Sequence, residues 1–218
     1  MVSPAAHIVR DGDAFIAQLR QRRRPRVFII SGPSGVGKDA VIERLRDSEE
    51  DTHFAITATT RPMRENEVDK VHYYFVTPDR FEDWIETDQL LEHAQVYSHQ
   101  YGVPKEPVRA ALALGQDVII KIDVQGAASL RRLMPEAISI FLAPESMERL
   151  FARLSARKSD DAEALARRFA EAGRELQRAH EFDYVVFNET NGILRAVADI
   201  RAILLAERER LIQPTIAL

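Results

Sequence analysis

Short runs of consecutive apolar or β-branched residues recur along the chain and are separated by stretches of helical spacing. The runs cover residues 27–30, 54–60, 73–76, 118–123, 139–142 and 184–188. A continuous apolar run is typical of a strand that is buried on both faces. Helical spacing is found around Val41, Ile42 and Leu45 and over residues 78–91, 147–179 and 192–211. Strands that alternate with helices predict an α/β three-layer fold with a mainly parallel sheet.

The first 24 residues differ from the rest of the chain. Phe15, Ile16 and Leu19 predict a short amphipathic helix that runs into an arginine cluster over residues 20–26, and Pro25 should end it. We interpret this cluster as a solvated helix end, with attraction to nucleic acid or a membrane as the alternative. The remaining chain then divides into one domain over residues 25–211 and a tail over residues 212–218.

Composition narrows the possible classes of protein. A chain of 218 residues with 45% apolar and 29% charged residues is expected to form one globular unit. The absence of cysteine excludes disulfides, zinc–thiolate sites, iron–sulfur clusters and thiol nucleophiles. A net charge of -4 argues against nucleic acid or a membrane as the main partner. No apolar run approaches the roughly 20 residues of a membrane span, and residues 1–10 lack the apolar core of a signal peptide, so we expect a cytoplasmic protein.

The most specific motif is the sequence GPSGVGKD, which lies between the first predicted strand and the helix that follows it. It comprises Gly32, Pro33, Ser34, Gly35, Val36, Gly37, Lys38 and Asp39. Glycines at these positions let backbone N–H groups turn toward phosphate oxygens, and the helix N-terminus adds its positive dipole. The lysine ammonium would reach the outer phosphates. The motif therefore predicts a site for a nucleoside triphosphate.

Asp39 departs from the usual form of this motif. A serine or threonine hydroxyl at that position normally binds Mg²⁺, whereas a carboxylate adds negative charge beside a polyphosphate. We therefore expect Mg²⁺ to arrive with ATP and to be held mainly by phosphate oxygens and water. Asp39 and Asp123, which ends a predicted strand, are the candidate protein ligands. The six histidines of the chain show no metal-ligand spacing.

A second polar segment, TATTRPMR over residues 57–64, follows the second predicted strand. It carries threonine hydroxyls and two arginines three residues apart, Arg61 and Arg64. A pair of guanidinium groups can fork onto one phosphate group. This segment is therefore a candidate binding site for a phosphorylated acceptor.

Several motifs, taken in order, resemble those of the guanylate kinase family. They are the phosphate loop, the TTRPxR segment, Glu67–Val68 with residues 73–75, residues 91–94, Tyr101–Gly102, and residues 122–126. The resemblance covers residues 27–211 and implies transfer of the γ-phosphoryl group of ATP to GMP, and also to dGMP. It further implies a P-loop kinase core over residues 25–58, 108–143 and 180–211, a small GMP-binding region over 59–107, and a helical lid over 144–179.

The resemblance also implies roles for individual residues. The positions that match ligands of the GMP phosphate are Arg61, Arg64, Tyr73 and Tyr101, and those that match guanine-binding residues are Glu92 and Thr57, with Asp123 beside them. The chemistry of Glu92 agrees, because one carboxylate can accept both the N1–H and the 2-amino group of guanine, whereas adenine offers no such pair. For the two tyrosines, ordinary packing in the core is the alternative.

The lid and the adenine end follow by the same resemblance. Arg153, Arg157 and Arg168 match lid arginines that surround the transferring phosphoryl group, so the implied catalytic residues are these three with Lys38 and Arg61. A solvated helix face is the alternative for the arginines. Asn188 matches an adenine contact, with a turn residue at the end of a strand as the alternative.

Three further positions depart from the family pattern. Lys121 stands where the family often has aspartate, Val103 replaces a hydroxyl residue, and Lys158 replaces a glycine of the lid. Two other functions stay open on the sequence: a ribose 1,5-bisphosphate kinase of related fold, which residues 37–39 and 101–103 also resemble, and a non-catalytic phosphopeptide-binding module. Glu92 with the arginine pair argues against the first, and the intact phosphate loop argues against the second. The sequence does not predict an oligomeric state.

Overall fold

The central layer of the protein is a five-stranded sheet in the order β2-β7-β1-β8-β9. The computed structural model describes residues 4–20, 24–65, 67–96, 98–156, 162–211 and 216. The strands are β1 (Val27–Ser31), β2 (Thr52–Ala55), β7 (Asp117–Lys121), β8 (Ile138–Pro144) and β9 (Tyr184–Asn188). Every neighbouring pair in this sheet is parallel, which confirms the predicted mainly parallel sheet.

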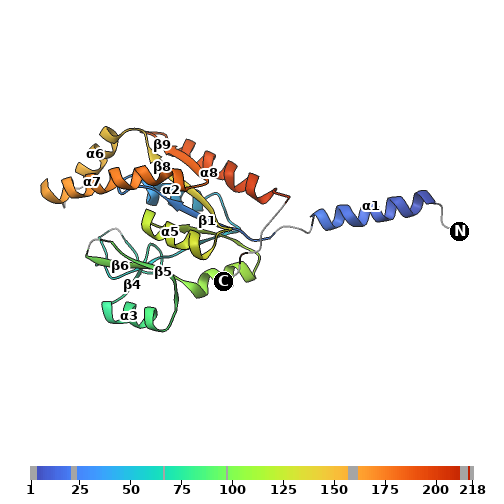
Figure 1. Ribbon diagram of the computed structural model, residues 1–218, viewed down its shortest axis with the longest axis horizontal. Coiled ribbons are helices and arrows are strands. Elements are labelled where there is room, and N and C mark those ends of the chain that lie inside the picture. The colour runs from blue at the N-terminus through green and yellow to red at the C-terminus, as the bar shows by residue number, and fades with distance from the viewer. Residues whose placement is uncertain are drawn as a thin grey trace.

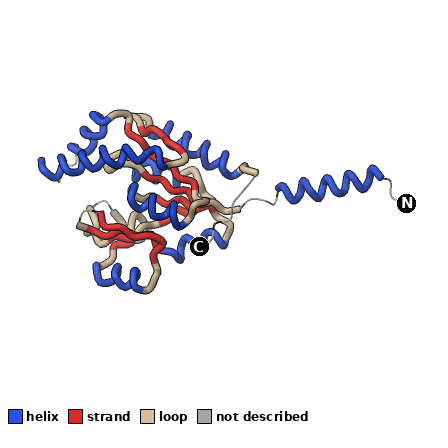
Figure 2. The backbone as a smooth tube through the Cα atoms, in the orientation of Figure 1, coloured by secondary structure: helices blue, strands red, loops and turns tan. Residues whose placement is uncertain are grey.

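Helices cover both faces of this sheet and make three layers, as Figures 1 and 2 show. On one face α2 (Lys38–Arg46) and α8 (Ile193–Arg208) pack against Phe28 and Ile30. On the other face α4 (Lys105–Ala113) and α5 (Val124–Leu133) pack against Val27 and Ile29. Successive residues of β1 thus enter opposite cores, which is why the strand is apolar throughout.

A second sheet of four strands, in the order β4-β3-β6-β5, forms the lower part of the molecule in Figure 1. Its strands are β3 (Ala58–Thr59), β4 (Tyr74–Phe75), β5 (Leu90–Val96) and β6 (His99–Pro104). The helix α3 (Pro78–Glu86) packs on it through Phe81, which is buried with Ala58 and Leu90.

The structure corrects two predicted elements in this region. The strand predicted over residues 54–60 is divided into β2 and β3, because the chain leaves the first sheet at Ile56 and Thr57 and pairs with β6 of the second. The helix predicted over residues 78–91 ends at Glu86. Asp88 follows with a left-handed φ of 54°, its carboxylate pairs with Lys105, and the next residues form β5.

The segment between β8 and β9 is helical, as predicted. It contains α6 (Met147–Ser155), α7 (Ala162–Gln177) and the short 3-10 helix η1 (Arg178–Glu181). Leu150 and Leu154 of α6 are buried against Ala172 of α7. Arg157 and Lys158, which the sequence assigns to the lid, lie outside the described residues.

The N-terminal helix is longer than the sequence indicated. It runs as α1 over Pro4–Arg20, and Figure 1 draws it apart from the two sheets. The side chains of Phe15, Ile16 and Leu19 are exposed. Among the helices of the described residues, none is long and apolar enough to cross a membrane.

Candidate active site

The predicted phosphate loop connects β1 to α2. Gly35 and Gly37 adopt left-handed φ values of 85° and 99°, which glycine tolerates and most other residues do not. Gly37 is also crowded: a Cβ atom there would lie 2.6 Å from Nδ2 of Asn188. The loop thus requires glycine for both conformation and space.

Lys38 is the first residue of α2, and its side chain folds over the loop. Its Nζ donates to the carbonyl oxygens of Gly32 and Pro33 at 2.5 and 3.2 Å. Burial lowers the pKa of Lys38, against the opposing effect of Glu175, Asp39 and Asp123. The ammonium therefore lies at the loop, beside the carboxylates that face it.

Two residues of α7 also contact the loop. Oε2 of Glu175 accepts the backbone N–H of Ser34 at 3.0 Å, and Nη2 of Arg168 donates to the Ser34 hydroxyl at 3.3 Å. Burial raises the pKa of Glu175, although the hydrogen bond from Ser34 and the charge of Lys38 oppose this. The predicted lid therefore already contacts the predicted phosphate loop.

Arg153 and Asn188 contact the loop from its other side. Arg153 donates to the carbonyl oxygens of Val36 and Asn188, both at 3.1 Å, and Nδ2 of Asn188 donates to the carbonyl oxygen of Val36 at 2.7 Å. Asn188 is buried. Its amide is thus tied to the loop backbone, and its predicted contact with adenine stays a prediction.

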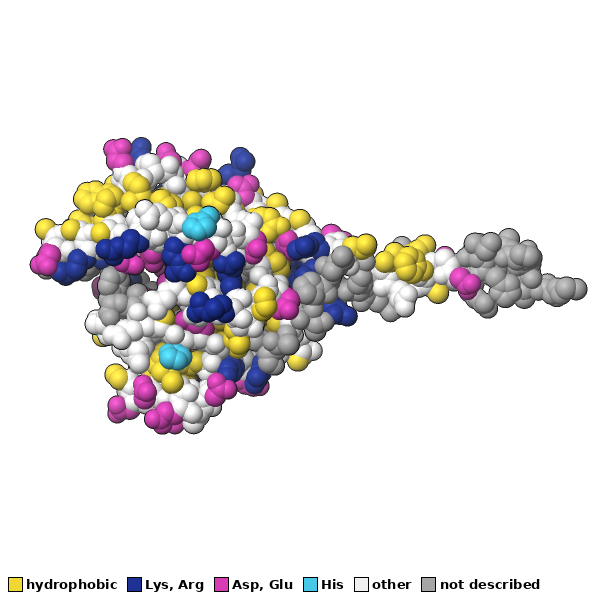
Figure 3. All heavy atoms as spheres, viewed as in Figure 1, with side chains coloured by type: hydrophobic (Ala, Val, Ile, Leu, Met, Phe, Trp, Pro, Cys, Tyr) yellow, Lys and Arg dark blue, Asp and Glu magenta, His cyan; other side chains and the backbone are white. Residues whose placement is uncertain are grey.

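Two cavities meet beside Lys38. The smaller, of about 140 Å³, is lined by Lys38, Asp39, Thr57, Tyr73, Tyr101, Lys121, Ile122 and Asp123. The larger, of about 830 Å³, runs along α7 and also includes Lys38 and Asp123 in its lining. Figure 3 shows Lys and Arg side chains gathered where the upper and lower parts of the molecule meet, and Arg167, Arg174 and Arg178 line the larger cavity there.

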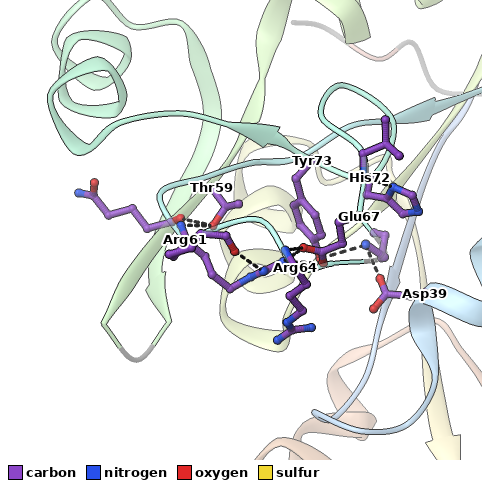
Figure 4. Close-up of polar contacts among 11 residues, drawn as sticks. Asp39, Thr59, Arg61, Arg64, Glu67, His72 and Tyr73 are labelled. Atoms are coloured by element: carbon purple, nitrogen blue, oxygen red, sulfur yellow. Dashed lines mark hydrogen bonds and ion pairs between the residues drawn. The ribbon is translucent and has the colours of Figure 1, made fainter. Parts of the chain in front are cut away.

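The arginine pair of the TTRPMR segment is held by Glu67, which the sequence marked as part of a motif without predicting this contact. Glu67 accepts two hydrogen bonds from Arg61 at 2.7 and 2.9 Å, and the backbone N–H of Arg64 at 2.8 Å. Burial would raise the pKa of Glu67, but these hydrogen bonds outweigh it and lower the pKa. Figure 4 shows Glu67 close to Arg64 and to the side chain of Arg61. Glu67 therefore fixes the position of Arg61.

Aromatic side chains complete this cluster. The guanidinium of Arg61 lies over the rings of Tyr73 and Phe75, at 5.5 and 5.6 Å from their centroids. Tyr73 and Tyr101 contact edge to face at 6.2 Å, and both line the smaller cavity. Arg64, by contrast, is exposed and lines neither of the two cavities.

Glu92 is buried on β5, with 6% of its surface exposed. Its Oε1 has no hydrogen-bond partner among the described residues. Burial, followed by the charge of Asp123, raises its pKa to about 8. A buried polar atom without a partner is costly, so such a group commonly serves a ligand.

Asp123 and Thr57 also line the smaller cavity. Asp123 caps α5, accepting the N–H groups of Gln125 and Gly126 at 2.8 and 2.9 Å. The hydroxyl of Thr57 donates to the carbonyl oxygen of Lys121 at 3.4 Å. Glu92 and Arg61, in contrast to Thr57 and Asp123, are not among the residues that line the smaller cavity.

Lys121 also lines this cavity and contacts two other residues of its lining. Its Nζ lies 2.5 Å from Oδ1 of Asp39 and 3.2 Å from the hydroxyl of Tyr73. Figure 4 shows Asp39, on the ribbon of α2, pointing toward the group of residues that contains Arg61, Glu67 and Tyr73. The sequence analysis noted Lys121 only as a departure from a pattern.

Comparisons with known proteins agree with the resemblance described from the motifs. A family model described as guanylate kinase matches residues 24–207. Guanylate kinase 2, chloroplastic/mitochondrial, of Oryza sativa subsp. japonica is 45% identical over 194 residues, which are 88% of this chain and 68% of that protein. A guanylate kinase of Thermus thermophilus is 45% identical over 191 residues, 86% of this chain and 84% of that protein.

A solved structure is also similar. The crystal structure of guanylate kinase from Anaplasma phagocytophilum has a TM-score of 0.74 and 29% sequence identity, and the match covers 88% of this chain and 90% of that one.

Proposed function

This chain belongs to the guanylate kinase family and transfers a phosphoryl group from ATP to GMP, and from that premise we propose how its own residues perform the reaction. Phosphoryl transfer between nucleotides needs little covalent chemistry from a protein. It depends on holding donor and acceptor in line and on positive charge where the transferring group passes. No covalent intermediate with the protein is required.

On the donor side, we propose that the loop over residues 32–39 binds the phosphates of ATP. Its backbone N–H groups and the N-terminus of α2 favour anions, and Lys38 lies at the end of the loop that faces both cavities. Arg153 and Arg168 already contact the loop, so they are in reach of a phosphate there. Arg157 completes the proposed set, although it lies outside the described residues.

On the acceptor side, Arg61, Tyr73 and Tyr101 bind the phosphate of GMP in this proposal. Support comes from the ion pair that fixes Arg61 and from the two tyrosines that line the smaller cavity. The side chain of Arg64 is exposed, and we propose that it turns onto the phosphate when GMP binds.

The observation that carries the assignment of the base is the unpaired Oε1 of buried Glu92. Guanine offers two adjacent donors, N1–H and the 2-amino group, which an ionised carboxylate can accept together. We propose that Glu92 accepts this pair, with Thr57 and Asp123 beside it. Adenine would leave the buried carboxylate unpaired, and a site of this kind can discriminate by a factor on the order of 10⁴.

The described residues offer single carboxylates near the proposed ATP site, but not a set of side chains that could surround Mg²⁺. Among the described residues, no group of three or more His, Cys, Asp or Glu side chains could hold a metal ion. Asp39 is bound to the ammonium of Lys121, and Asp123 caps α5. This donor set fits an ion that arrives with ATP, with Asp123 able to bind one of its waters. Such an ion supplies positive charge that offsets the charge of the phosphates.

The relatives named above are guanylate kinases, and none of their names points to either alternative function. A panel of acceptors tests them directly: ADP release is measured with GMP, dGMP, AMP and ribose 1,5-bisphosphate. We expect GMP to give the highest kcat/KM, dGMP to be used as well, and AMP to be near background. A preference for ribose 1,5-bisphosphate, or no turnover with any acceptor, would overturn the assignment.

The compartment and the partners beyond substrates stay predictions. A cytoplasmic location and the lack of a nucleic-acid or membrane partner rest on the sequence alone. Cell fractionation and a gel-shift assay would test them.

A further inference from the structure

Two departures from the family pattern contact each other. Asp39 stands where the phosphate-loop motif normally has a hydroxyl residue, and Lys121 stands where the family often has aspartate. They are 82 residues apart in the sequence, yet their charged groups lie 2.5 Å apart. At position 39 an acid thus replaces the usual hydroxyl residue, and at position 121 a base replaces the acid that the family often has.

The surroundings keep the lysine charged. Burial would lower the pKa of Lys121, but the nearby Asp39 and Tyr73 outweigh burial and raise it. The side chain of Lys121 is 17% exposed, and its Nζ lies 4.6 Å from the ring centroid of Tyr73. An ammonium has three N–H donors, and Asp39 and Tyr73 use two of them. One donor therefore stays available to a ligand in the cavity that Lys121 lines.

We propose that the ammonium of Lys121 binds the phosphate group of the acceptor nucleotide, on the side that faces Lys38. This inference rests on the proposed function, since it concerns the acceptor of the same reaction. It assigns to Lys121 a direct role in binding that the motif-based analysis did not give it.

The balance of charge favours this role. The cavity is lined by two lysines, Lys38 and Lys121, and by two carboxylates, Asp39 and Asp123. Arg61, the proposed phosphate ligand on the other side, already shares its charge with Glu67. Without Lys121, an incoming phosphate would meet the carboxylate of Asp39 without the ammonium that now lies 2.5 Å from it. With Lys121, the phosphate can bind the ammonium together with the hydroxyl of Tyr73.

The test compares an acceptor with and without its phosphate. Dissociation constants of GMP and of guanosine are measured by calorimetric competition for the wild type and for Lys121→Met. We expect GMP to bind about 10- to 100-fold more weakly to the variant, as for loss of a charge-assisted hydrogen bond, and guanosine to change less than about twofold.

Lys105→Met is the matched control. Lys105 also pairs with an aspartate, Asp88, at 2.5 Å, and its side chain is also 17% exposed, but it is remote from the cavity. We expect this control to bind both ligands like the wild type. An equal loss of GMP and guanosine in Lys121→Met would overturn the proposal, because it would indicate a structural role only.

A double variant separates binding from neutralisation. In Lys121→Met/Asp39→Asn, the carboxylate of Asp39 is also removed, so GMP binding should recover in part. Complete recovery would overturn the proposal, because Lys121 would then serve only to neutralise Asp39. Failure of the proposed function is distinct: it would appear as a wild type that does not phosphorylate GMP, whatever the variants bind.

Discussion

The residue that we propose to bind guanine, Glu92, also lowers the stability of the folded protein when its carboxyl group ionises. Its buried carboxylate has no hydrogen-bond partner among the described residues for Oε1, and its pKa is raised to about 8. The folded protein therefore holds a proton on Glu92 between the ordinary pKa of a glutamate and about pH 8, where the unfolded chain has lost it. The contribution of Glu92 to stability consequently falls as the pH rises through this window.

Glu92→Gln should raise stability and lower activity. At about pH 8 the variant should melt at a higher temperature than the wild type, because glutamine does not ionise, whereas at about pH 5 the two should differ little. Its kcat/KM for GMP should fall roughly 10- to 1000-fold, since an NH₂ group replaces one of the acceptors for guanine. Thermal melts at both pH values and steady-state kinetics measure these effects.

Glu82→Gln, which changes an exposed glutamate of α3, is the control and should leave both quantities unchanged. An unchanged kcat/KM for GMP in Glu92→Gln would remove Glu92 from the proposed guanine site.

Sequence patterns found some site residues and missed others for a physical reason. Lys38 belongs to a contiguous motif, and Glu92 to a short segment with a family resemblance. The contact of Lys121 with Asp39 joins residues 82 apart, and that of Glu175 with Ser34 joins residues 141 apart. Such pairs depend on which strands and helices become neighbours, and local spacing carries no information about them. Glu67, six residues from Arg61, belongs to one of the motifs of the resemblance, but its ion pair with Arg61 was not predicted.

At the scale of elements, the main relation is between α7 and the phosphate loop. Glu175 brings a carboxylate to a backbone N–H of that loop, where an ATP phosphate would also be attracted. Removing its charge should strengthen ATP binding. We expect Glu175→Gln to lower the dissociation constant of ATP about fivefold at about pH 8, on the order of 1 kcal/mol of repulsion near a surface.

Calorimetry with ATP measures this effect. Glu171→Gln is the control, because Glu171 lines the same cavity but pairs with Arg174 instead of the loop. Weaker ATP binding in Glu175→Gln would contradict the prediction and would indicate that Glu175 supports the loop.

Elements buried on both faces were predictable, and those of the second sheet were less so. The apolar runs of β1, β7 and β8, which are largely buried, identified these strands to within a few residues, and the run of β9 did so although its Val185 and Phe187 are exposed. The strands β5 and β6 carry polar residues such as Glu92, His93 and Gln100 among the apolar ones, so no continuous run marks them. The division of residues 54–60 between two sheets depends on partners that the segment itself does not specify.

At the scale of the whole molecule, a buried polar network ties the sheet to α8 at the start of β7, whereas the candidate active site lies at the other end of that strand. Asp117, at the start of β7, accepts the backbone N–H of Arg26 at 2.8 Å and Nε of Arg208 at 2.6 Å. Arg208 also donates to Glu49 and Thr52. This network joins the beginnings of β2 and β7 to the end of α8.

Asp117→Ala should destabilise the fold without changing the reaction. This change removes the acceptor of the Arg26 backbone N–H and of Nε of Arg208, while Glu49 still pairs with Arg208, so we expect a cost of about 1 to 3 kcal/mol. Denaturant unfolding measures this loss, and kcat per folded molecule should match the wild type. Asp199→Ala, which removes a more exposed partner of Arg195 on α8, should cost less than about 1 kcal/mol. Equal stability of Asp117→Ala and the wild type would contradict the prediction.

The crossing at Ile56 and Thr57 also separates the first sheet from the segment that we propose to bind the acceptor. Antiparallel pairing of β3 with β6 brings this crossing beside Val103 and Pro104, where the chain returns to the core. The segment that carries the second sheet, which we propose to bind the acceptor, is thus an insertion whose two ends are adjacent, and such an insertion can be lengthened, shortened or grafted at little cost in loop closure. A replacement segment with another base specificity would have to fit the rest of the protein mainly at two contacts. These are the contact of Tyr73 with Lys121 and the contact of Glu92 with α5.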